Sequence, residues 1–336
     1  MHDVNRFMTA LLLACSSAGA ADSNTASAAS SSPSPVALRP AAKVAHAAQA
    51  SMLATAWAGR RAVAVGAHGV VLLSDDQGKT WRQAGKVPLD VTLTAVSFAG
   101  EREGWAVGHA GVVLHTRDGG EEWEVQRSAP DQDRPLFGVH FFDAGHGVAV
   151  GLWSLILTTS DGGRLWTERQ LGAPPGARRA DLNLFGLFAG PGGTLYAAAE
   201  KGYLLHTADM GASWSYLATG YRGSFWTGTA LPDGALLAGG LRGALYRSAD
   251  AGQHWTRIDT GSTASITALV RTGGASGASG VIAVGQDGLI LRSDDGGASF
   301  RARYRRDRLA LNAALPLAGF TPPLMSARGP APADTK

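Results

Sequence analysis

The sequence is poor in features that characterise several common protein classes. It has a single cysteine, Cys15, among 336 residues, so no disulfide framework can hold the fold. Charged residues make up only 17% of the chain and the formal net charge is +3, which does not indicate the clustered basic surface of a nucleic-acid-binding protein. We therefore expect no nucleic-acid partner and a fold that is stabilised by its core alone.

Glycine and tryptophan, in contrast, are abundant, with 45 and 9 residues. Helix-favouring Lys and Glu are scarce, and the composition is typical of a β-rich exported protein. The length is ample for one large core.

The first 21 residues have the features of a signal peptide. Arg6 supplies a basic region, residues 7–14 form a short apolar run, and residues 18–20 form a small-residue cleavage site. The apolar run is too short to span a bilayer. A second interpretation remains open, because residues 12–15, LLAC, resemble a bacterial lipobox whose Cys15 is lipidated and anchors the protein to a membrane. Both interpretations predict export.

An eight-residue motif recurs six times: a hydroxyl residue, any residue, Asp, any residue, Gly, two further residues and an aromatic. The copies begin at residues 74, 116, 159, 207, 248 and 293 and read SDDQGKTW, TRDGGEEW, TSDGGRLW, TADMGASW, SADAGQHW and SDDGGASF. The Asp can accept hydrogen bonds from the backbone that follows it, and the Gly can take a positive φ, so the motif predicts a hairpin turn. The aromatic residue can wedge between neighbouring sheets. The predicted structural residues are Asp76, Asp118, Asp161, Asp209, Asp250, Asp295, Trp81, Trp123, Trp166, Trp214 and Trp255.

Successive motif aspartates lie 42, 43, 48, 41 and 45 residues apart, a period typical of propeller blades. Two strand patterns and a Gly-x-x-Gly hairpin precede most copies, as in AVGAHGVVLLS at residues 64–74, and one strand follows. Four short antiparallel strands per repeat predict an all-β protein, a β-propeller. Six complete blades occupy about residues 52–304. We expect a seventh blade shared by both chain ends, from residues 36–48 and 309–317; the alternative is a six-bladed ring.

The remaining segments complete the predicted domain organisation. Residues 1–21 form the signal peptide, unless a lipoprotein signal ends before Cys15. Residues 22–49 form an Ala/Ser/Pro-rich linker, residues 50–318 the propeller, and residues 319–336, with four prolines, a disordered tail.

The combination of AVGxxG, an apolar strand and the Asp motif behind a signal peptide resembles propellers related to the photosystem II stability/assembly factor, within the Asp-box (BNR) superfamily. The resemblance covers roughly residues 51–317. It implies a seven-bladed periplasmic or lumenal propeller without catalysis or cofactor that binds membrane-protein partners during assembly. In non-photosynthetic hosts, it implies envelope transport or assembly machinery as the partner.

Catalytic alternatives are less well supported by the residues. The Asp boxes occur in sialidases, so a sialidase-like glycosidase or a carbohydrate-binding propeller is the alternative function. Paired carboxylates carry that chemistry, but a catalytic pair occurs once per protein, whereas these aspartates occur once per blade. Glu200 has no evident partner, and Leu38-Arg39-Pro40 does not match the sialidase Arg-Ile-Pro motif. We also expect no metal site, because the histidines never pair at i, i+2 or i+4 spacing.

If the protein acts by binding, we expect its partner-binding residues in exposed loops. The loop between the second and third strands of each blade should open on the same face as the connections between blades, opposite the Asp turns. We expect its tips at His68, His109, Trp153, Lys201, Arg242 and Asp287. Its residues include the Trp, Tyr and Arg that dominate binding hot spots, although exposed loop residues are often only solvated. A second patch, RARYRRDR at residues 301–308, could bind an acidic partner or anionic lipid, or could be one solvated strand face. The candidate partner-binding residues of the expected monomer are His109, Trp153, Lys201, Tyr221, Arg222, Arg242, Arg303 and Arg305.

Overall fold

The computed structural model describes residues 39–273, 279–317 and 322–332. The predicted signal peptide, the lipidation candidate Cys15 and most of the predicted linker lie outside the described residues. All of the described residues belong to one compact unit, Ala37–Lys336.

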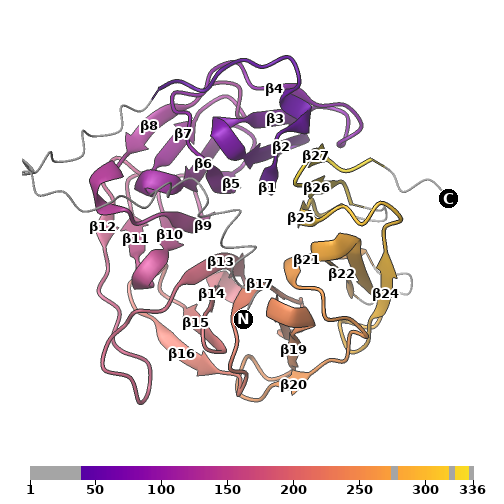
Figure 1. The fold of residues 1–336 in the computed structure, drawn as a ribbon. Helices are drawn as coiled ribbons and strands as arrows, with labels where there is room; N and C mark the ends of the chain where they lie inside the picture. Colours follow the sequence, from indigo (N-terminus) through magenta and orange to yellow (C-terminus); the bar gives the residue numbers. More distant parts are fainter. Residues whose placement is uncertain (1–38, 274–278, 318–321, 333–336) are drawn as a thin grey trace, which may run out of the picture. The chain divides into compact units, whose positions relative to one another are not determined.

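Seven small antiparallel sheets follow one another around a ring, so the chain is an all-β, seven-bladed propeller (Figure 1). The number of blades confirms the prediction and excludes the six-bladed alternative. In every blade the strands are paired in sequence order.

The first three blades have four strands each. Blade 1 contains β1 (Met52–Ala58), β2 (Arg61–Gly66), β3 (Val71–Ser74) and β4 (Arg82–Gln83). Blade 2 contains β5 (Leu93–Ala99), β6 (Glu103–Gly108), β7 (Val113–Thr116) and β8 (Glu124–Arg127). Blade 3 contains β9 (Leu136–Phe141), β10 (Gly147–Gly151), β11 (Ile156–Thr159) and β12 (Thr167–Glu168).

The next three blades are built in the same way, and the seventh has three strands. Blade 4 contains β13 (Leu184–Ala189), β14 (Leu195–Ala199), β15 (Tyr203–Thr207) and β16 (Ser215–Ala218). Blade 5 contains β17 (Phe225–Ala230), β18 (Leu236–Gly240), β19 (Leu245–Ser248) and β20 (Thr256–Arg257). Blade 6 contains β21 (Ile266–Gly273), β22 (Ser279–Gly285), β23 (Leu289–Ser293) and β24 (Arg301–Tyr304). Blade 7 contains β25 (Leu311–Ala314), β26 (Leu324–Ser326) and β27 (Gly329–Pro330).

Single turns of 3-10 helix occur mainly in the hairpins. They are η1 (Ala47–Gln49), η2 (Ala67–Gly69), η3 (His109–Gly111), η4 (Pro130–Gln132), η5 (Leu152–Ser154), η6 (Pro191–Gly193), η7 (Leu241–Gly243) and η8 (Gln286–Gly288). Among the described residues, no helix is both long and apolar enough to cross a membrane.

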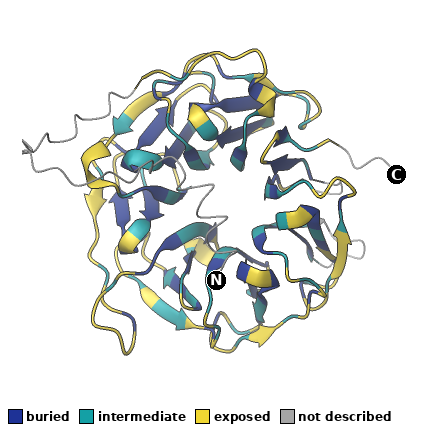
Figure 2. Ribbon diagram, viewed as in Figure 1, coloured by how far each residue is buried: buried dark blue, intermediate teal, exposed yellow. Residues whose placement is uncertain are grey.

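The core lies between blades, where the faces of neighbouring sheets pack together and the middle strands are almost wholly buried (Figure 2). The motif aromatic of each blade packs against the preceding blade, as the sequence predicts. Trp123 of blade 2, for example, packs with Val63, Val65 and Leu73 of blade 1. Trp81, Trp166, Trp214, Trp255 and Phe300 occupy the equivalent interfaces.

The Asp motif forms the predicted turn between the third and fourth strands. In blade 1, Ser74 Oγ donates to Asp76 Oδ1 at 2.8 Å, and the backbone N–H groups of Lys79 and Thr80 donate to the same oxygen at 3.0 and 2.9 Å. Gly78 takes a φ of 85°, which explains the glycine at this position.

The first glycine of the hairpin has a different reason. A Cβ on Gly151 would collide with the carbonyl oxygen of Pro135, where the chain enters the inner strand of the same blade. This close approach explains why AVG recurs before the hairpin.

Ring closure differs from the prediction that both chain ends share blade 7. Its three strands all come from the C-terminal segment, and residues 39–46 form no strand. That segment instead lies along blade 1, where Lys43 Nζ donates to Ala84 O at 2.6 Å and Ala41 N donates to Val87 O at 3.1 Å.

The C-terminal boundary of the propeller also differs from the predicted one at residue 318. Strands β26 and β27 lie within residues 319–336, where the sequence predicts disorder. Met325 is completely buried in the interface between blades 7 and 1. The proline content of this segment concealed a short hairpin with an apolar face.

Candidate functional site

The propeller presents two faces with different loops. The hairpins between second and third strands touch the connections between blades: Ser154 N donates to Leu182 O, and Gly202 N to Gly223 O, both at 2.7 Å. The Asp turns touch the other hairpins, as Gly162 N donates to Gly145 O at 2.8 Å. We call these the connection face and the Asp-box face. This arrangement is the one expected from the sequence.

The tip residue of each connection-face hairpin has a left-handed backbone, which is uncommon for residues other than glycine. The φ values lie between 53° and 59° at His68, Ala110, Trp153, Lys201, Arg242 and Asp287. The tip of blade 2 is therefore Ala110, and the prediction of His109 as a tip residue is wrong by one position. His109 is half-buried, and burial lowers the pKa of its imidazole.

The inner strand of every blade contains a bulge at its second residue, which has no partner in the register of the neighbouring strand. In three blades this residue is polar and bonds to the next blade. Thr94 Oγ1 donates to Leu136 O at 2.6 Å, Thr267 Oγ1 to Leu311 O at 2.7 Å, and Asn312 Nδ2 to Met52 O at 3.0 Å. In these three blades the bulge residue therefore links one blade to the next.

Blades 3, 4 and 5 place an aromatic residue at this position instead. Phe137, Phe185 and Trp226 are half-buried, and the rings of Phe137 and Phe185 stack with centroids 6.0 Å apart. We call these three residues the aromatic arc. Sequence reasoning missed Phe137 and Phe185, although their shared place in the repeat was visible in the sequence.

The arc adjoins the most exposed tryptophan of the connection face. Trp153 is 54% exposed in η5, and its backbone N–H donates to Asn183 Oδ1 at 3.1 Å. Asn183 directly precedes β13, which carries Phe185. The hairpin that carries Trp153 therefore contacts the segment that leads into Phe185.

Cationic side chains lie on the same face in blades 4 and 5. Arg222 and Arg242 are exposed, and neither forms an ion pair with another described residue. Lys201 Nζ lies 3.6 Å from Asp181 Oδ1. Tyr221 is half-buried, its hydroxyl donates to Leu241 O at 3.0 Å, and burial raises its pKa. Tyr221 is thus part of the packing beneath the connection face.

The two candidate arginines of the second predicted patch, residues 301–308, differ in their exposure. Arg303 is exposed on β24. Arg305 is only 3% exposed, because its guanidinium binds both oxygens of Asp307 and donates to Pro332 O at 2.9 Å. Strand β24 ends at Tyr304, so strand alternation does not extend to Arg305. Arg305 anchors the C-terminal segment and is not accessible to a partner, contrary to the prediction.

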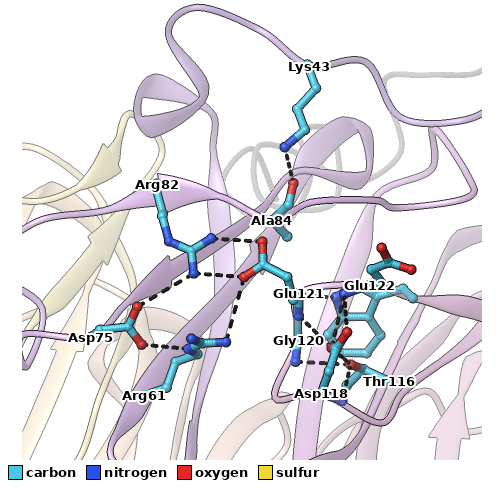
Figure 3. A network of polar contacts seen from close by, with 11 residues as sticks. Lys43, Arg61, Asp75, Arg82, Ala84, Thr116, Asp118, Gly120, Glu121 and Glu122 are labelled. Carbon is cyan, nitrogen blue, oxygen red and sulfur yellow. Dashed lines mark hydrogen bonds and ion pairs between the residues drawn. The ribbon is translucent and has the colours of Figure 1, made fainter.

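On the Asp-box face, a charged network joins blades 1 and 2 (Figure 3). Arg82 binds both oxygens of Glu121 at 2.9 and 2.7 Å, and Arg61 Nε lies 2.6 Å from Asp75. Arg82 and Asp75 are 3.6 Å apart, which links the two pairs. Because each charge already faces an opposite one, we interpret this network as an inter-blade contact rather than a ligand site.

The motif aspartates and Glu200 also have structural partners. Motif aspartates bind their own turns, and Glu200 accepts hydrogen bonds from the backbone N–H and side-chain amide of Asn183, both at 3.0 Å. No group of three or more His, Cys, Asp or Glu residues within the described ranges could hold a metal ion.

Comparison with known proteins matches the family described as photosynthesis system II assembly factor YCF48, over residues 48–131 and 126–279. Among solved structures, one of YCF48 bound to D1 peptide has a TM-score of 0.68 and 20% identity, covering 84% of this chain and 92% of that one. YCF48 from Cyanidioschyzon merolae has a TM-score of 0.66 and 17% identity, covering 88% and 97%. The WD40 repeats of RRP9 have a TM-score of 0.62 and 8% identity, covering 83% and 86%. At these identities the structures show a shared fold. None of the curated proteins compared with the chain matches it.

Proposed function

Because the chain belongs to the photosynthesis system II assembly factor YCF48 family, we propose that it is a non-enzymatic factor that binds a membrane-protein complex during assembly or stabilisation. The partner is a membrane complex or an envelope transport or assembly machine, and the protein acts after export, with Cys15 as a candidate lipid anchor. A related protein has been solved with a D1 peptide bound, which supports a polypeptide as the ligand.

The aromatic arc is the observation that carries this proposal. Three successive blades place half-buried aromatic residues where three of the other four blades place a polar link. The exposed Trp153 lies in the hairpin that contacts the start of blade 4 on the same face. Large aromatic side chains that lose their remaining exposure on binding are the commonest hot spots of protein interfaces. Arg222 and Arg242 add the positive charge that favours an acidic segment of the partner.

The glycosidase alternative gains no support from a specific observation. The motif carboxylates accept hydrogen bonds within their own turns, and this leaves their role structural.

The proposal is tested by affinity purification of the tagged protein from solubilised host membranes, with quantitative mass spectrometry. We expect one membrane complex to be enriched, and Trp153→Ala combined with Phe185→Ala to reduce its recovery by roughly tenfold or more. Alanine is compatible with the tip backbone, because Ala110 adopts it in blade 2.

Val125→Ala is the matched control, since Val125 is a similarly exposed apolar residue, at 43%, on the outer strand of blade 2. Equal recovery with the double variant and the control would show that the arc is not the binding site. Binding or cleavage of a glycan without any retained complex would favour the carbohydrate alternative.

A further inference from the structure

The six Asp boxes can be compared with one another. The box of blade 3 differs from the others at the residue directly before the aromatic. In four other boxes this residue places a side-chain donor against the second carboxylate oxygen of the Asp. Thr80, Ser213 and Ser299 do so through hydroxyls at 2.6 Å, and His254 Nδ1 lies 2.6 Å from Asp250. Blade 3 has Leu165, which has no such donor. Asp161 Oδ1 accepts from the Thr159 hydroxyl and the Leu165 N–H, and no side chain of another described residue donates to Asp161 Oδ2.

Leu165 is also unusually accessible. Its 66% exposure is the highest among the exposed large hydrophobic residues of the described chain. Replacement of a bonded polar residue by an exposed leucine does not stabilise the turn, so packing gives no reason for it.

The box of blade 4 departs at a second position, the residue after the Asp. This position has a left-handed backbone in every box: three boxes use Gly119, Gly162 and Gly296 there, and blades 1 and 5 have Gln77 and Ala251. Blade 4 has Met210, with a φ of 56° and a side chain that is 47% exposed. A long apolar side chain is therefore held outward by a backbone that does not favour it.

Leu165 and Met210 both line one groove between blades 3 and 4 on the Asp-box face, with a volume of about 250 Å³. The groove also contains the carboxylates of Asp161 and Asp209 and the guanidinium of Arg169. Arg169 Nε is already bonded to Thr158 Oγ1 at 2.8 Å. The lining also includes His146, whose imidazole lies 3.0 Å from Asp143, and Arg164 acts on Asp161 from outside the groove.

We propose that this groove is a second binding site, for an extended peptide segment that presents an aliphatic side chain next to a lysine or arginine. The aliphatic side chain contacts Leu165 and Met210. The cation donates to Asp161 Oδ2 and so supplies the hydrogen bond that the neighbouring residue supplies in other boxes. This site lies on the face opposite the aromatic arc, so the propeller can hold two polypeptide segments at once.

The test follows the Met210 methyl group by NMR in protein labelled with ¹³C-methyl methionine. The probes are two acetylated and amidated peptides, GALKAG and its charge-reversed counterpart GALEAG. We expect GALKAG to shift the Met210 methyl resonance in a saturable, salt-sensitive manner and GALEAG to leave it in place.

Leu165→Thr is the decisive variant, because it restores the hydroxyl that Thr80 uses and should therefore keep the turn folded. We expect it to bind GALKAG roughly tenfold more weakly, since an internal donor then occupies Asp161 and the apolar contact is lost. Ser299→Leu, which puts the same side chain into the box of blade 6, should leave the Met210 titration unchanged.

The proposal is wrong if the Met210 methyl does not respond at millimolar GALKAG, if GALEAG shifts it equally, or if Leu165→Thr titrates like the parent protein. It is also wrong if phosphatidylcholine vesicles alone perturb this methyl, because the groove then contacts lipid. None of these outcomes depends on the aromatic arc, so the site can fail while the proposed function stands.

Discussion

At the scale of single residues, the Asp boxes show how exposed carboxylates can stabilise a turn. Hydrogen bonds from the Ser213 hydroxyl and backbone lower the pKa of Asp209 from 3.8 to about 2, and those from Ser299 do the same for Asp295. His140 is shifted by a different cause, since burial alone lowers the pKa of its imidazole from 6.5 to about 4. Both shifts mean that acid destabilises the folded protein, but each acts in its own pH range.

This difference predicts two phases of acid destabilisation. The folded pKa of His140 lies below its ordinary value, so the unfolded chain binds the proton more tightly and stability falls as pH drops from about 6.5 to about 4. The loss is on the order of 3 kcal/mol for a shift of this size. The aspartates also have depressed folded pKa values, and their contribution is lost only as pH falls from about 4 towards 2.

Urea unfolding midpoints measured between pH 7 and pH 2 would check this. His140→Leu should reduce the decline above pH 4, to which His109 and His206 also contribute because burial lowers their pKa values. Asp209→Asn should weaken only the decline below pH 4. A first phase that persists undiminished in His140→Leu would assign it to another group.

At the scale of elements, the blade is a local unit completed by its neighbour. The Asp turn is made within eight residues, and its aromatic fills the interface with the preceding blade. The sequence predicted both roles correctly, because turn chemistry and spacing are local. It misplaced the tip of blade 2, because Gly-x-x-Gly does not show which of its two central residues turns left-handed.

Substitution of two tryptophans should therefore lower the stability of the fold to very different extents. Trp123 is 3% exposed, and Trp123→Ala should lower the free energy of unfolding by about 3–5 kcal/mol, since it removes a buried ring. Trp153→Ala should change it by about 0.5 kcal/mol or less, since that side chain is mostly exposed. Urea denaturation of the two variants checks the contrast, and a large loss with Trp153→Ala would show that this residue is structural.

At the scale of the whole molecule, the ring is closed by segments far apart in sequence. Trp57 Nε1 of blade 1 donates to Pro316 O at 2.6 Å, and Asn312 Nδ2 donates to Met52 O. Arg305 holds Pro332 from blade 6. The short strands of blade 7 are consequently part of the closure.

Truncation tests this role of the C-terminal segment. A chain ending at residue 323 lacks β26 and β27 and should unfold at a lower temperature and less cooperatively, because the interface between blades 7 and 1 loses Met325. A chain ending at residue 332 keeps every described contact and should unfold like the full chain. Equal melting of the two truncated chains would show that blade 7 is dispensable.

The sequence by itself determined the blade architecture, the Asp turns and the aromatic residues between blades, because these features repeat and each depends on a few adjacent residues. Only the tertiary structure decided how the ring closes, that Arg305 is buried, and that Phe137, Phe185 and Trp226 form an arc. It also brought Leu165 and Met210 into one groove. The physical reason is that these arrangements join residues from different blades, whose proximity depends on the curvature of the closed ring and not on any local pattern.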